Sequence, residues 1–262
     1  MNSVPQALII ASVWPEPESS AAGVRLEHWV QLFQRNGWGV TLASSAKNQD
    51  PERYVKDWKV ETKTLLLNHS DDDAWWQSRT WDFILFDRFM TEEQFSFRAH
   101  RFQKNAVKIL ETIDLHWLRK YRQLGIDPEE DRLRELASML RCDWVTTVSF
   151  FERDLLLNDY GFDSDWVQWI PFLYEQPIIE SAPAWKMDFK NNMAPDLLWL
   201  GNFRHPPNRE SAVHMAKNLF PMIRGQVADA KLWVGGAYPS KEISDLHNPK
   251  QGVHLLGPQT NR

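Results

Sequence analysis

Short apolar runs alternate with helical patterns along most of the chain, and this alternation limits the folds open to it. Residues 7–11 (ALIIA) form an uninterrupted apolar run, as expected for a strand covered on both faces of a sheet. Residues 24–33 then place their apolar side chains on one helical stripe, and Asn36-Gly37 supplies a helix stop. The run at 40–43 returns to a strand. A strand, a helix and a strand in this order predict a parallel sheet with right-handed crossovers.

The same alternation continues along the chain and predicts an α/β fold. Further strands are predicted at 64–67, 81–86, 107–110, 144–148 and 167–170, with helices at 92–105, 128–141 and 152–158. Residues 175–196 break the pattern with three prolines and weak periodicity, which is typical of a linker. Beyond them, strands are predicted at 197–200, 231–234 and 253–256, with helices at about 209–224 and from Lys241.

The predicted elements divide the chain into two unequal domains. Residues 1–178 have the size of one complete doubly wound domain, 179–196 form the linker, and 197–262 supply only half of a second such domain. A three-stranded parallel sheet would expose an edge and an apolar face. We therefore expect either a partner at that edge or a chain truncated within its second domain.

Charge and composition argue against several classes of function. The formal net charge is -5, with Lys and Arg scattered, so no nucleic-acid partner is expected. The longest apolar runs fall far short of the roughly 20 residues that a membrane helix needs. No basic region precedes the first apolar run, so no secretory signal is predicted and the expected location is the cytoplasm. The single cysteine, Cys142, is expected to pack in the core.

A glycine corner at residues 197–211 (LLWLGNFRHPPNRES) marks one candidate binding site. The apolar run stops at Gly201-Asn202, and a helix is predicted to start near Asn208. Ligands of open parallel sheets bind outside the carboxyl ends of the strands, where this loop lies. Gly201 would permit close backbone approach, and N–H groups at the helix start would bind an anionic phosphate. Gly23 and Gly235-Gly236 occupy comparable positions, although a simple turn explains Gly235-Gly236 equally well.

Asp114 and His116 form a second candidate site, because they follow the strand predicted at 107–110. In one interpretation both side chains contact a substrate. In the other, Asp114 is a helix cap and His116 a surface residue at a helix start. A metal site built from these residues and His100 lacks the spaced His pair or Cys partner of a zinc site, so none is predicted. No motif of nucleophile-elbow hydrolases, phosphate-loop kinases or dinucleotide oxidoreductases occurs.

Several segments, in order along the chain, resemble family 4 glycosyltransferases with the GT-B fold. ETIDLHWLRKYR at 111–122 is similar to the family's Asp-Thr-x-Asp-Leu-His-x-x-Arg-x-x-Arg, with Glu111 in place of the first Asp. Ser149 and Glu152 fit a Ser-x-x-Glu segment that follows a strand in the family. Residues 197–257 are similar to the opening of the donor-binding domain in one branch of the family.

The resemblance implies a GT-B-like architecture with an incomplete second Rossmann-like domain. It implies transfer of a sugar from a nucleotide diphosphate sugar to an acceptor, with retention of configuration and no metal or other cofactor. The family's Glu-x7-Glu segment is absent, so transfer is expected to be impaired. The alternatives are a non-catalytic fragment or binding module and an epimerase of the same architecture.

The resemblance also implies roles for individual residues. His116 and Asp114 are implied as catalytic residues, and Arg204 or Arg209 as a substitute for cations that the family places near the diphosphate. The implied donor-binding residues are Gly23, Gly201, Asn202, Arg204, Asn208, Gly235, Gly236 and Gly257, and the implied residues of an acceptor-side or structural cleft are Arg25, Arg119, Ser149 and Glu152.

Overall fold

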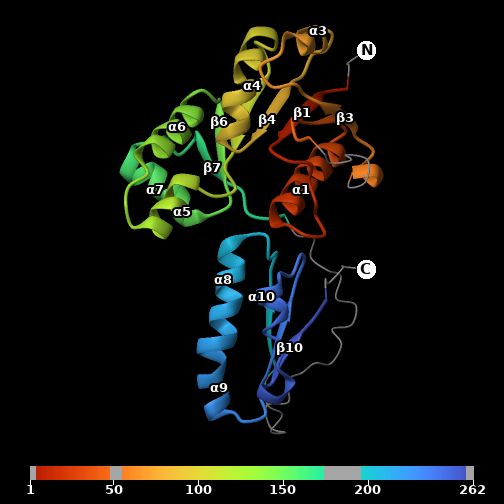
Figure 1. The fold of residues 1–262 in the computed structure, drawn as a ribbon. Coiled ribbons are helices and arrows are strands. Elements are labelled where there is room, and N and C mark those ends of the chain that lie inside the picture. The colour runs from red at the N-terminus through yellow and green to blue at the C-terminus, as the bar shows by residue number, and fades with distance from the viewer. Residues whose placement is uncertain (1–3, 48–54, 174–195, 258–262) are drawn as a thin grey trace. The chain divides into compact units, whose positions relative to one another are not determined.

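The computed structural model describes residues 4–47, 55–173 and 196–257 (Figure 1). The described residues form two compact units, one before residue 174 and one after residue 195, with residues 18–20 grouped with the second. The predicted linker at 179–196 lies outside the described residues except for Asp196, which begins a strand.

The first unit is a seven-stranded parallel sheet in the order β3-β2-β1-β4-β5-β6-β7 (Figure 1). Its strands are β1 (Gln6–Ala11), β2 (Gly39–Ser44), β3 (Glu61–Thr64), β4 (Phe83–Asp87), β5 (Val107–Glu111), β6 (Trp144–Thr147) and β7 (Val167–Trp169). The strand order reverses between β1 and β4, which makes this pair the topological switch point of a doubly wound sheet. The α/β fold predicted from the alternating pattern is confirmed.

Strand β3 lies three residues before its predicted position at 64–67. The polar segment Glu61–Thr64 pairs with β2, whereas Leu65 follows the strand and its side chain is buried. β3 is an edge strand, and polar residues on an edge protect it from pairing with other chains. The apolar run was therefore wrongly predicted to be the strand itself, and of its leucines only Leu65 is buried, whereas Leu66 and Leu67 are 39% and 47% exposed.

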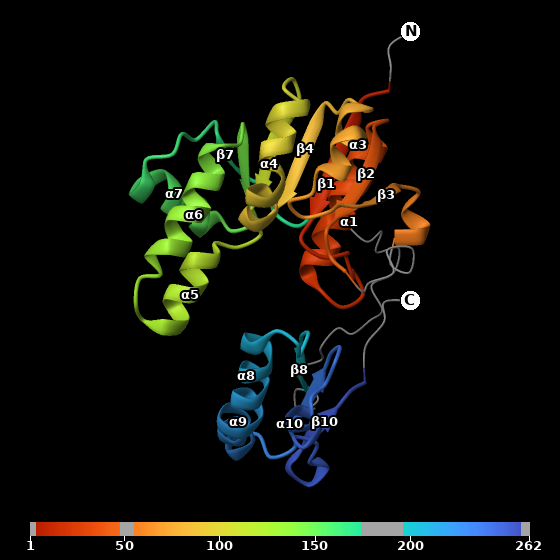
Figure 2. The same cartoon turned by 45° about the horizontal axis from the view of Figure 1, so that its top comes forward.

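Helices cover both faces of this sheet. Alternate residues of each strand point to opposite faces, and they pack with the helices in two separate apolar clusters. Ile9 and Leu42 pack with Trp29 of α1, whereas Ile10 and Phe86 belong to the cluster built with α3 to α7. Figure 2 shows α5, α6 and α7 grouped together. The helices are α1 (Ala21–Arg35), α3 (Asp73–Gln77), α4 (Phe89–Phe102), α5 (His116–Leu124), α6 (Glu129–Leu140) and α7 (Phe150–Tyr160), with 3-10 turns at Lys56–Trp58 and Ser70–Asp72.

A buried ion pair joins α1 to the middle of the sheet. Arg25 Nη2 lies 2.9 Å from Glu111 Oε2, and neither side chain is exposed. Glu111 also accepts hydrogen bonds from Trp29 Nε1 at 2.6 Å and Thr146 Oγ1 at 3.1 Å, and Arg25 Nη1 donates to Pro171 O at 2.6 Å. Burial raises the pKa of Glu111, and the charge of Arg25 opposes that rise. Arg25 was expected to be either an acceptor-side residue or a structural one, and its full burial favours the structural role.

The second unit is a three-stranded parallel sheet in the order β10-β9-β8. A helix runs along these strands from α8 through a π-helical turn into α9 (Figure 1). The π turn precedes Pro221, whose ring clashes with the carbonyl four residues earlier and whose nitrogen has no hydrogen to donate. The elements are β8 (Asp196–Leu200), α8 (Pro206–His214), the π turn (Met215–Leu219), α9 (Phe220–Gln226), β9 (Lys231–Gly235), α10 (Lys241–Ser244), a 3-10 turn (Pro249–Gln251) and β10 (Val253–Leu255).

One face of the three-stranded sheet is open among the described residues. Leu197 and Trp199 pack into the apolar cluster with Phe220 of α9. Leu198 and Leu200 point to the opposite face and are 62% and 56% exposed. The exposed apolar face expected for a sheet of this size is therefore present in the described part of the chain.

The buried ion pair yields a stability prediction. Glu111→Gln is expected to lower the free energy of unfolding by about 3–5 kcal/mol, because Arg25 would stay buried without a counter-charge. Urea denaturation followed by circular dichroism measures the change. The matched control is Glu61→Gln, which breaks a half-exposed pair with Arg79 and should cost no more than about 1 kcal/mol. Equal losses in the two variants would contradict this account.

Candidate functional site

Polar side chains gather where β1, β4 and β5 end, at the switch point of the first unit. Ser12 follows β1 and Asp87 ends β4. The Ser12 N–H and Oγ both donate to Asp87 Oδ2, at 3.0 and 2.7 Å, and Arg88 Nη1 lies 3.3 Å from Ser12 Oγ. The switch point of a doubly wound sheet is where its ligands bind.

Two residues at these strand ends have a left-handed backbone. Arg88 has φ 73° and Ile113 has φ 60°, which is a genuine outlier for a β-branched residue. The Asp114 N–H donates to Thr112 O at 2.7 Å around Ile113, and the Ile113 N–H lies 3.4 Å from Glu111 Oε1. Such strained residues cluster at functional sites, where the surrounding structure holds them in place.

His116 is the first residue of α5, and its ring meets Phe89 edge-on with 5.5 Å between centroids. Asp114 lies between His116 and Arg119: its Oδ1 is 3.9 Å from His116 Nε2, and its Oδ2 accepts from Arg119 Nη1 at 2.6 Å. Burial lowers the pKa of His116 to about 4, opposed by Asp114 and assisted by Arg119 and Arg88. The imidazole is therefore neutral near pH 7, a state in which it can accept a proton or a hydrogen bond.

Three buried polar atoms of this region have no hydrogen-bond partner in the described structure: Asp87 Oδ1, Arg88 Nε and His116 Nε2. Arg88 Nε lies 3.7 Å from Asp87 Oδ1. An unbonded buried polar atom carries a desolvation cost that a ligand contact would relieve. We call Ser12, Asp87, Arg88, Asp114 and His116 the switch-point cluster.

The sequence analysis singled out two of the five residues of this cluster. Asp114 and His116 were found, and Arg119 lies beside them as an ion-pair partner of Asp114. Asp87 and Arg88 were missed, although two charged residues directly after the apolar run FILF were an available signal. Ser12 carried no comparable signal, since its role depends on β1 and β4 being neighbours in the sheet.

Ser149 and Glu152 lie at the start of α7. Ser149 Oγ accepts the Glu152 N–H at 3.3 Å, and Glu152 Oε2 accepts the N–H of Leu115, just before α5, at 3.2 Å. Burial raises the pKa of Glu152 to about 7, with Asp114 adding to the rise and the Leu115 N–H opposing it. The side chains of Ser149 and Glu152 therefore both bond to backbone N–H groups. Glu152 contacts the segment that leads to His116.

In the second unit, the loops after β8 and β9 meet through their glycines. The Gly201 N–H donates to Gly235 O at 3.2 Å. Gly236 has φ 150°, and a Cβ there would lie 1.8 Å from Gly201 O, so no other residue fits. A Cβ on Gly201 would lie 2.5 Å from the Trp199 ring. Gly257 follows β10, and a Cβ there would meet nothing within 4 Å.

The N–H groups expected to bind a phosphate at this corner are already engaged or missing. Helix α8 begins at Pro206-Pro207, two residues earlier than predicted, and proline has no N–H. The N–H groups of Asn208 and Arg209 both donate to His205 O, at 3.1 and 3.2 Å. The Gly201 N–H is bonded as well, so these three N–H groups each have a partner within the loops.

Side chains hold the same corner in shape. Asn202 Oδ1 accepts the Arg204 N–H at 2.9 Å, and Asn208 Nδ2 donates to Asn202 O at 3.2 Å. The exposed Arg204 guanidinium lies 3.5 Å from the centroid of the Tyr238 ring, in the loop after β9. Arg209 instead lies 3.7 Å from Glu242. The two arginines that the sequence proposed therefore have different neighbours, an aromatic ring for Arg204 and a carboxylate for Arg209.

Gly23 has a packing role in the first unit. It lies inside α1, which begins at Ala21 and not at Val24 as predicted. A Cβ on Gly23 would lie 2.5 Å from the backbone carbon of Glu16, so glycine is needed where the loop before α1 crosses the helix. Gly23 was predicted to let a diphosphate approach the backbone. In the structure, the backbone of Glu16 lies close to it.

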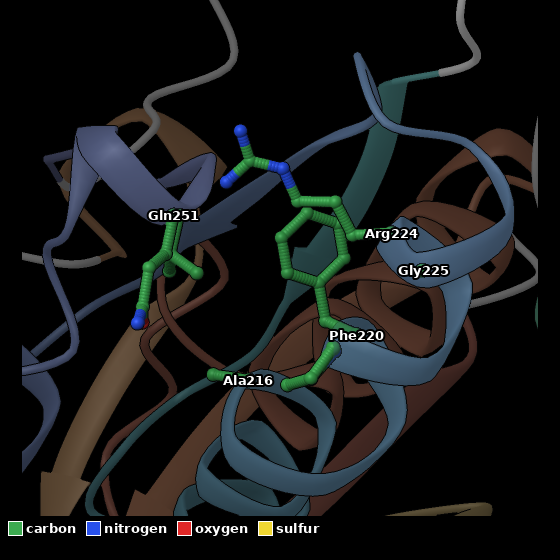
Figure 3. Close-up of a pocket in the computed structure, with 7 residues that line it drawn as sticks. Ala216, Phe220, Arg224, Gly225 and Gln251 are labelled. Atoms are coloured by element: carbon green, nitrogen blue, oxygen red, sulfur yellow. The ribbon is translucent and has the colours of Figure 1, made fainter.

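A cavity of about 310 Å³ lies elsewhere in the second unit (Figure 3). It is near the amino ends of β9 and β10, whereas the glycine loops lie at the carboxyl ends. Arg224 on its wall donates from Nε to Ala228 O and from Nη1 to Lys250 O, both at 3.1 Å. None of the predicted donor-binding residues lines this cavity, which is formed by Ala216, Phe220, Pro221, Arg224, Gly225, Gln251 and Val253.

Across residues 4–47, 55–173 and 196–257, no group of three or more His, Cys, Asp or Glu is arranged to hold a metal ion. His100, on α4, lies 3.2 Å from Arg141 O. No described helix combines the length and apolar character needed to cross a bilayer.

No protein-family model matches the chain, and no curated protein matches it. Solved structures do. Sucrose-phosphate synthase from Thermosynechococcus elongatus aligns over 98% of this chain and 71% of its own, with a TM-score of 0.61 and 13% identity. A glycosyltransferase from Rickettsia africae ESF-5 aligns over 98% and 69%, with a TM-score of 0.55 and 13% identity.

A third structure, from Listeria monocytogenes and assigned as a UDP-N-acetylglucosamine 2-epimerase, aligns over 99% and 70%, with a TM-score of 0.54 and 12% identity. The chain has a GT-B-like fold. At such low identities the likeness establishes the fold and nothing finer. It confirms the architecture that the sequence resemblance implied.

Glu135, which bonds the backbone of His116, yields a prediction of how stability depends on pH. Glu135 of α6 accepts the N–H groups of His116 and Trp117 at 3.3 and 3.2 Å, and burial raises its pKa from 4.5 to about 8, opposed by those two N–H groups. Between these values the folded state holds the proton more tightly than the unfolded state. The contribution of Glu135 to stability should therefore be complete below pH 4.5 and lost as pH rises to about 8.

Glu135→Gln removes that titration and keeps an oxygen acceptor. The wild type should lose stability relative to the variant as pH rises, by at most about 1.4 kcal/mol per pH unit for one proton. Urea denaturation at a series of pH values measures the difference. Glu130→Gln, at an exposed position of the same helix, is the control and should track the wild type. A constant difference between wild type and Glu135→Gln across the range would refute the assignment.

Proposed function

We propose that the chain is a glycosyltransferase of the family 4 type, retaining and metal-independent, which transfers a sugar from a nucleoside diphosphate sugar to an acceptor. The observation that carries the proposal is the switch-point cluster, placed at the carboxyl edge of the first sheet in a fold of the GT-B kind. Two of the solved structures that share this fold are described as a sucrose-phosphate synthase and a glycosyltransferase.

The cluster supports the acceptor side of such a reaction. Transfer forms a bond between an acceptor oxygen and the anomeric carbon, breaks the bond from that carbon to the diphosphate, and releases the acceptor's hydroxyl proton. Neutral His116 and the carboxylate of Asp87 are acceptors for hydroxyl hydrogen bonds, and Arg88 is a donor. In this proposal Asp114 and Arg119 fix the polar surroundings of His116 through their 2.6 Å ion pair.

The donor side of the proposal depends on side chains of the second unit. The leaving diphosphate gains negative charge as the bond to the sugar breaks, and electrostatic stabilisation of that charge is the main catalytic demand. With the local N–H groups engaged, Arg204 is the cation proposed to supply it, held at the corner by Asn202 and Asn208. Gly201, Gly235 and Gly236 let the two loops pack closely beside it.

A non-catalytic binding module is the second candidate. The bonded N–H groups and the two prolines at the start of α8 favour it, because they leave a weaker anion site than a free helix N-terminus would. Such a module would bind a ligand through the switch-point cluster without turning over a nucleotide sugar. An epimerase is a third outcome that the same assay detects.

The test is turnover of a panel of UDP-, GDP- and ADP-sugars by the full chain, with water as acceptor. We expect one donor to release its nucleoside diphosphate, followed by chromatography. His116→Ala should lower kcat by about 100-fold, in the range of a lost acid-base or hydrogen-bonding group. Arg204→Gln should mainly raise KM for the donor, because it removes a charge that contacts the diphosphate.

Each variant has a matched control. His100→Ala removes an exposed histidine of the same unit, and Arg209→Gln removes the neighbouring cation that pairs with Glu242. Both should behave as the wild type. Donor binding in calorimetry without turnover would favour the binding module, and an epimerised nucleotide sugar without nucleotide release would favour the epimerase. Equal losses of kcat in His116→Ala and His100→Ala would contradict the proposed role of the cluster.

A further inference from the structure

Helix α5 begins without a cap of its own. Its N-cap residue is Leu115, which has no side-chain hydrogen bond to the helix. The first N–H groups of an α-helix have no partner within that helix, and negative charge is favoured beside them. Here the N–H groups of Leu115, His116 and Trp117 are bonded by carboxyls that come from two other helices.

Glu152 reaches α5 through an altered capping motif. Ser149 and Glu152 have the Ser-x-x-Glu spacing of a capping box, in which the Glu side chain turns back to the N-cap of its own helix. Ser149 follows the motif, since its Oγ accepts the Glu152 N–H. The Glu152 carboxyl instead bonds to the Leu115 N–H at 3.2 Å, so a local motif of α7 is used to hold the start of α5.

Glu135 completes the arrangement from α6. Its two oxygens are divided between the His116 N–H, at 3.3 Å, and the Trp117 N–H, at 3.2 Å. Glu135 is 1% and Glu152 7% exposed, so water does not compete strongly for these bonds. The two carboxyls thus bond three consecutive N–H groups around His116.

The turn before α5 explains why such a hold is needed. Ile113 is left-handed, a conformation that persists only where neighbouring structure over-determines it. On one side of this turn, Glu111 is anchored in the sheet by its bonds to Arg25 and Trp29. On the other side, the bonds from the N–H groups of residues 115–117 to Glu135 and Glu152 hold the chain in place.

We propose that Glu135 and Glu152 are positioning residues that keep the His116 imidazole inside the switch-point cluster. The proposal rests on the function proposed for that cluster. Neither carboxyl needs to touch a substrate in this role. They act through the backbone of residues 115–117, so their loss should move and hydrate the imidazole while leaving the rest of the cluster in place.

The test is the pKa of His116, measured by NMR from the pH dependence of its ring C–H shifts in the full chain, with His116→Gln to assign the signal. In the wild type that pKa should be about 4. Glu135→Ala and Glu152→Ala should each raise it by about one unit or more, because a displaced ring regains hydration. Glu152→Gln keeps the one oxygen that the Leu115 N–H needs and should restore a value near that of the wild type, whereas Glu135→Gln keeps one of two accepting oxygens and should restore the value in part.

The control is Glu92→Ala. Glu92, on α4, is as buried as Glu135, but its carboxyl pairs with Arg141 at the C-terminal end of α6 and does not bond the backbone of residues 115–117. Its replacement should destabilise the chain and leave the His116 pKa unchanged. A similar pKa rise in Glu92→Ala would show general loosening and overturn the proposal, as would an unchanged pKa in both Ala variants at Glu135 and Glu152.

Shortened side chains cover the case in which the Ala variants do not fold. Glu135→Asp and Glu152→Asp keep a carboxyl group and withdraw it by one methylene, so they should raise the His116 pKa by a smaller amount. The readout needs no turnover, which separates this proposal from the proposed function. If a donor is turned over, the Ala variants should lower kcat at unchanged donor KM; an inactive wild type with the expected pKa changes would contradict only the proposed function.

Discussion

The buried carboxyl of Glu111 connects the core of the first unit to its candidate site. One of its oxygens receives hydrogen bonds from α1 and β6, and the other lies 3.4 Å from the N–H of left-handed Ile113. Burial of an ion pair brings little net stability, because desolvation offsets most of the attraction. The pair with Arg25 instead fixes one arrangement of helix, strand and turn. The position of the chain that leads to His116 therefore depends on a contact made in the core.

The two units treat the carboxyl ends of their strands differently. In the first unit these ends carry charged side chains, three of whose buried atoms have no hydrogen-bond partner among the described residues. In the second unit the glycine loops pack against each other, and the backbone N–H groups around Gly201 and Asn208 bond within the loops. Recognition by side chains is thus better supported on the first sheet than recognition by backbone on the second.

Much of the fold could be predicted because strands buried on both faces read as uninterrupted apolar runs. β3 was misplaced since an edge strand is polar, and its position is set by pairing with β2. α5 was foreseen only as one of two readings of Asp114 and His116, because it is short and mostly polar. The glycines at 23, 201 and 236 were predicted to let a ligand approach, and a Cβ at each would meet neighbouring atoms of the chain. What approaches them is the chain itself, which only the packed structure reveals.

The candidate site was harder to predict than the fold, because its members meet through tertiary structure. Asp87 and Ser12 become partners only once β1 and β4 are neighbours. Glu135 lies 19 positions from His116, and its bond to that backbone exists only when α6 packs beside α5. The resemblance to known motifs singled out His116, Asp114 and Glu152, whereas Glu135, which bonds the backbone of His116, belonged to no motif.

Ile113 shows how stability and local geometry compete in this chain. Glycine adopts a left-handed backbone without the steric cost that isoleucine bears there. Engineering for thermal tolerance would therefore be drawn to this position. The freedom that glycine brings would also loosen the link between Glu111 and His116, so a more heat-resistant chain could have a less ordered site. Efforts to stabilise this protein are better directed at surface helix positions such as Gly225, where a Cβ meets nothing within 4 Å.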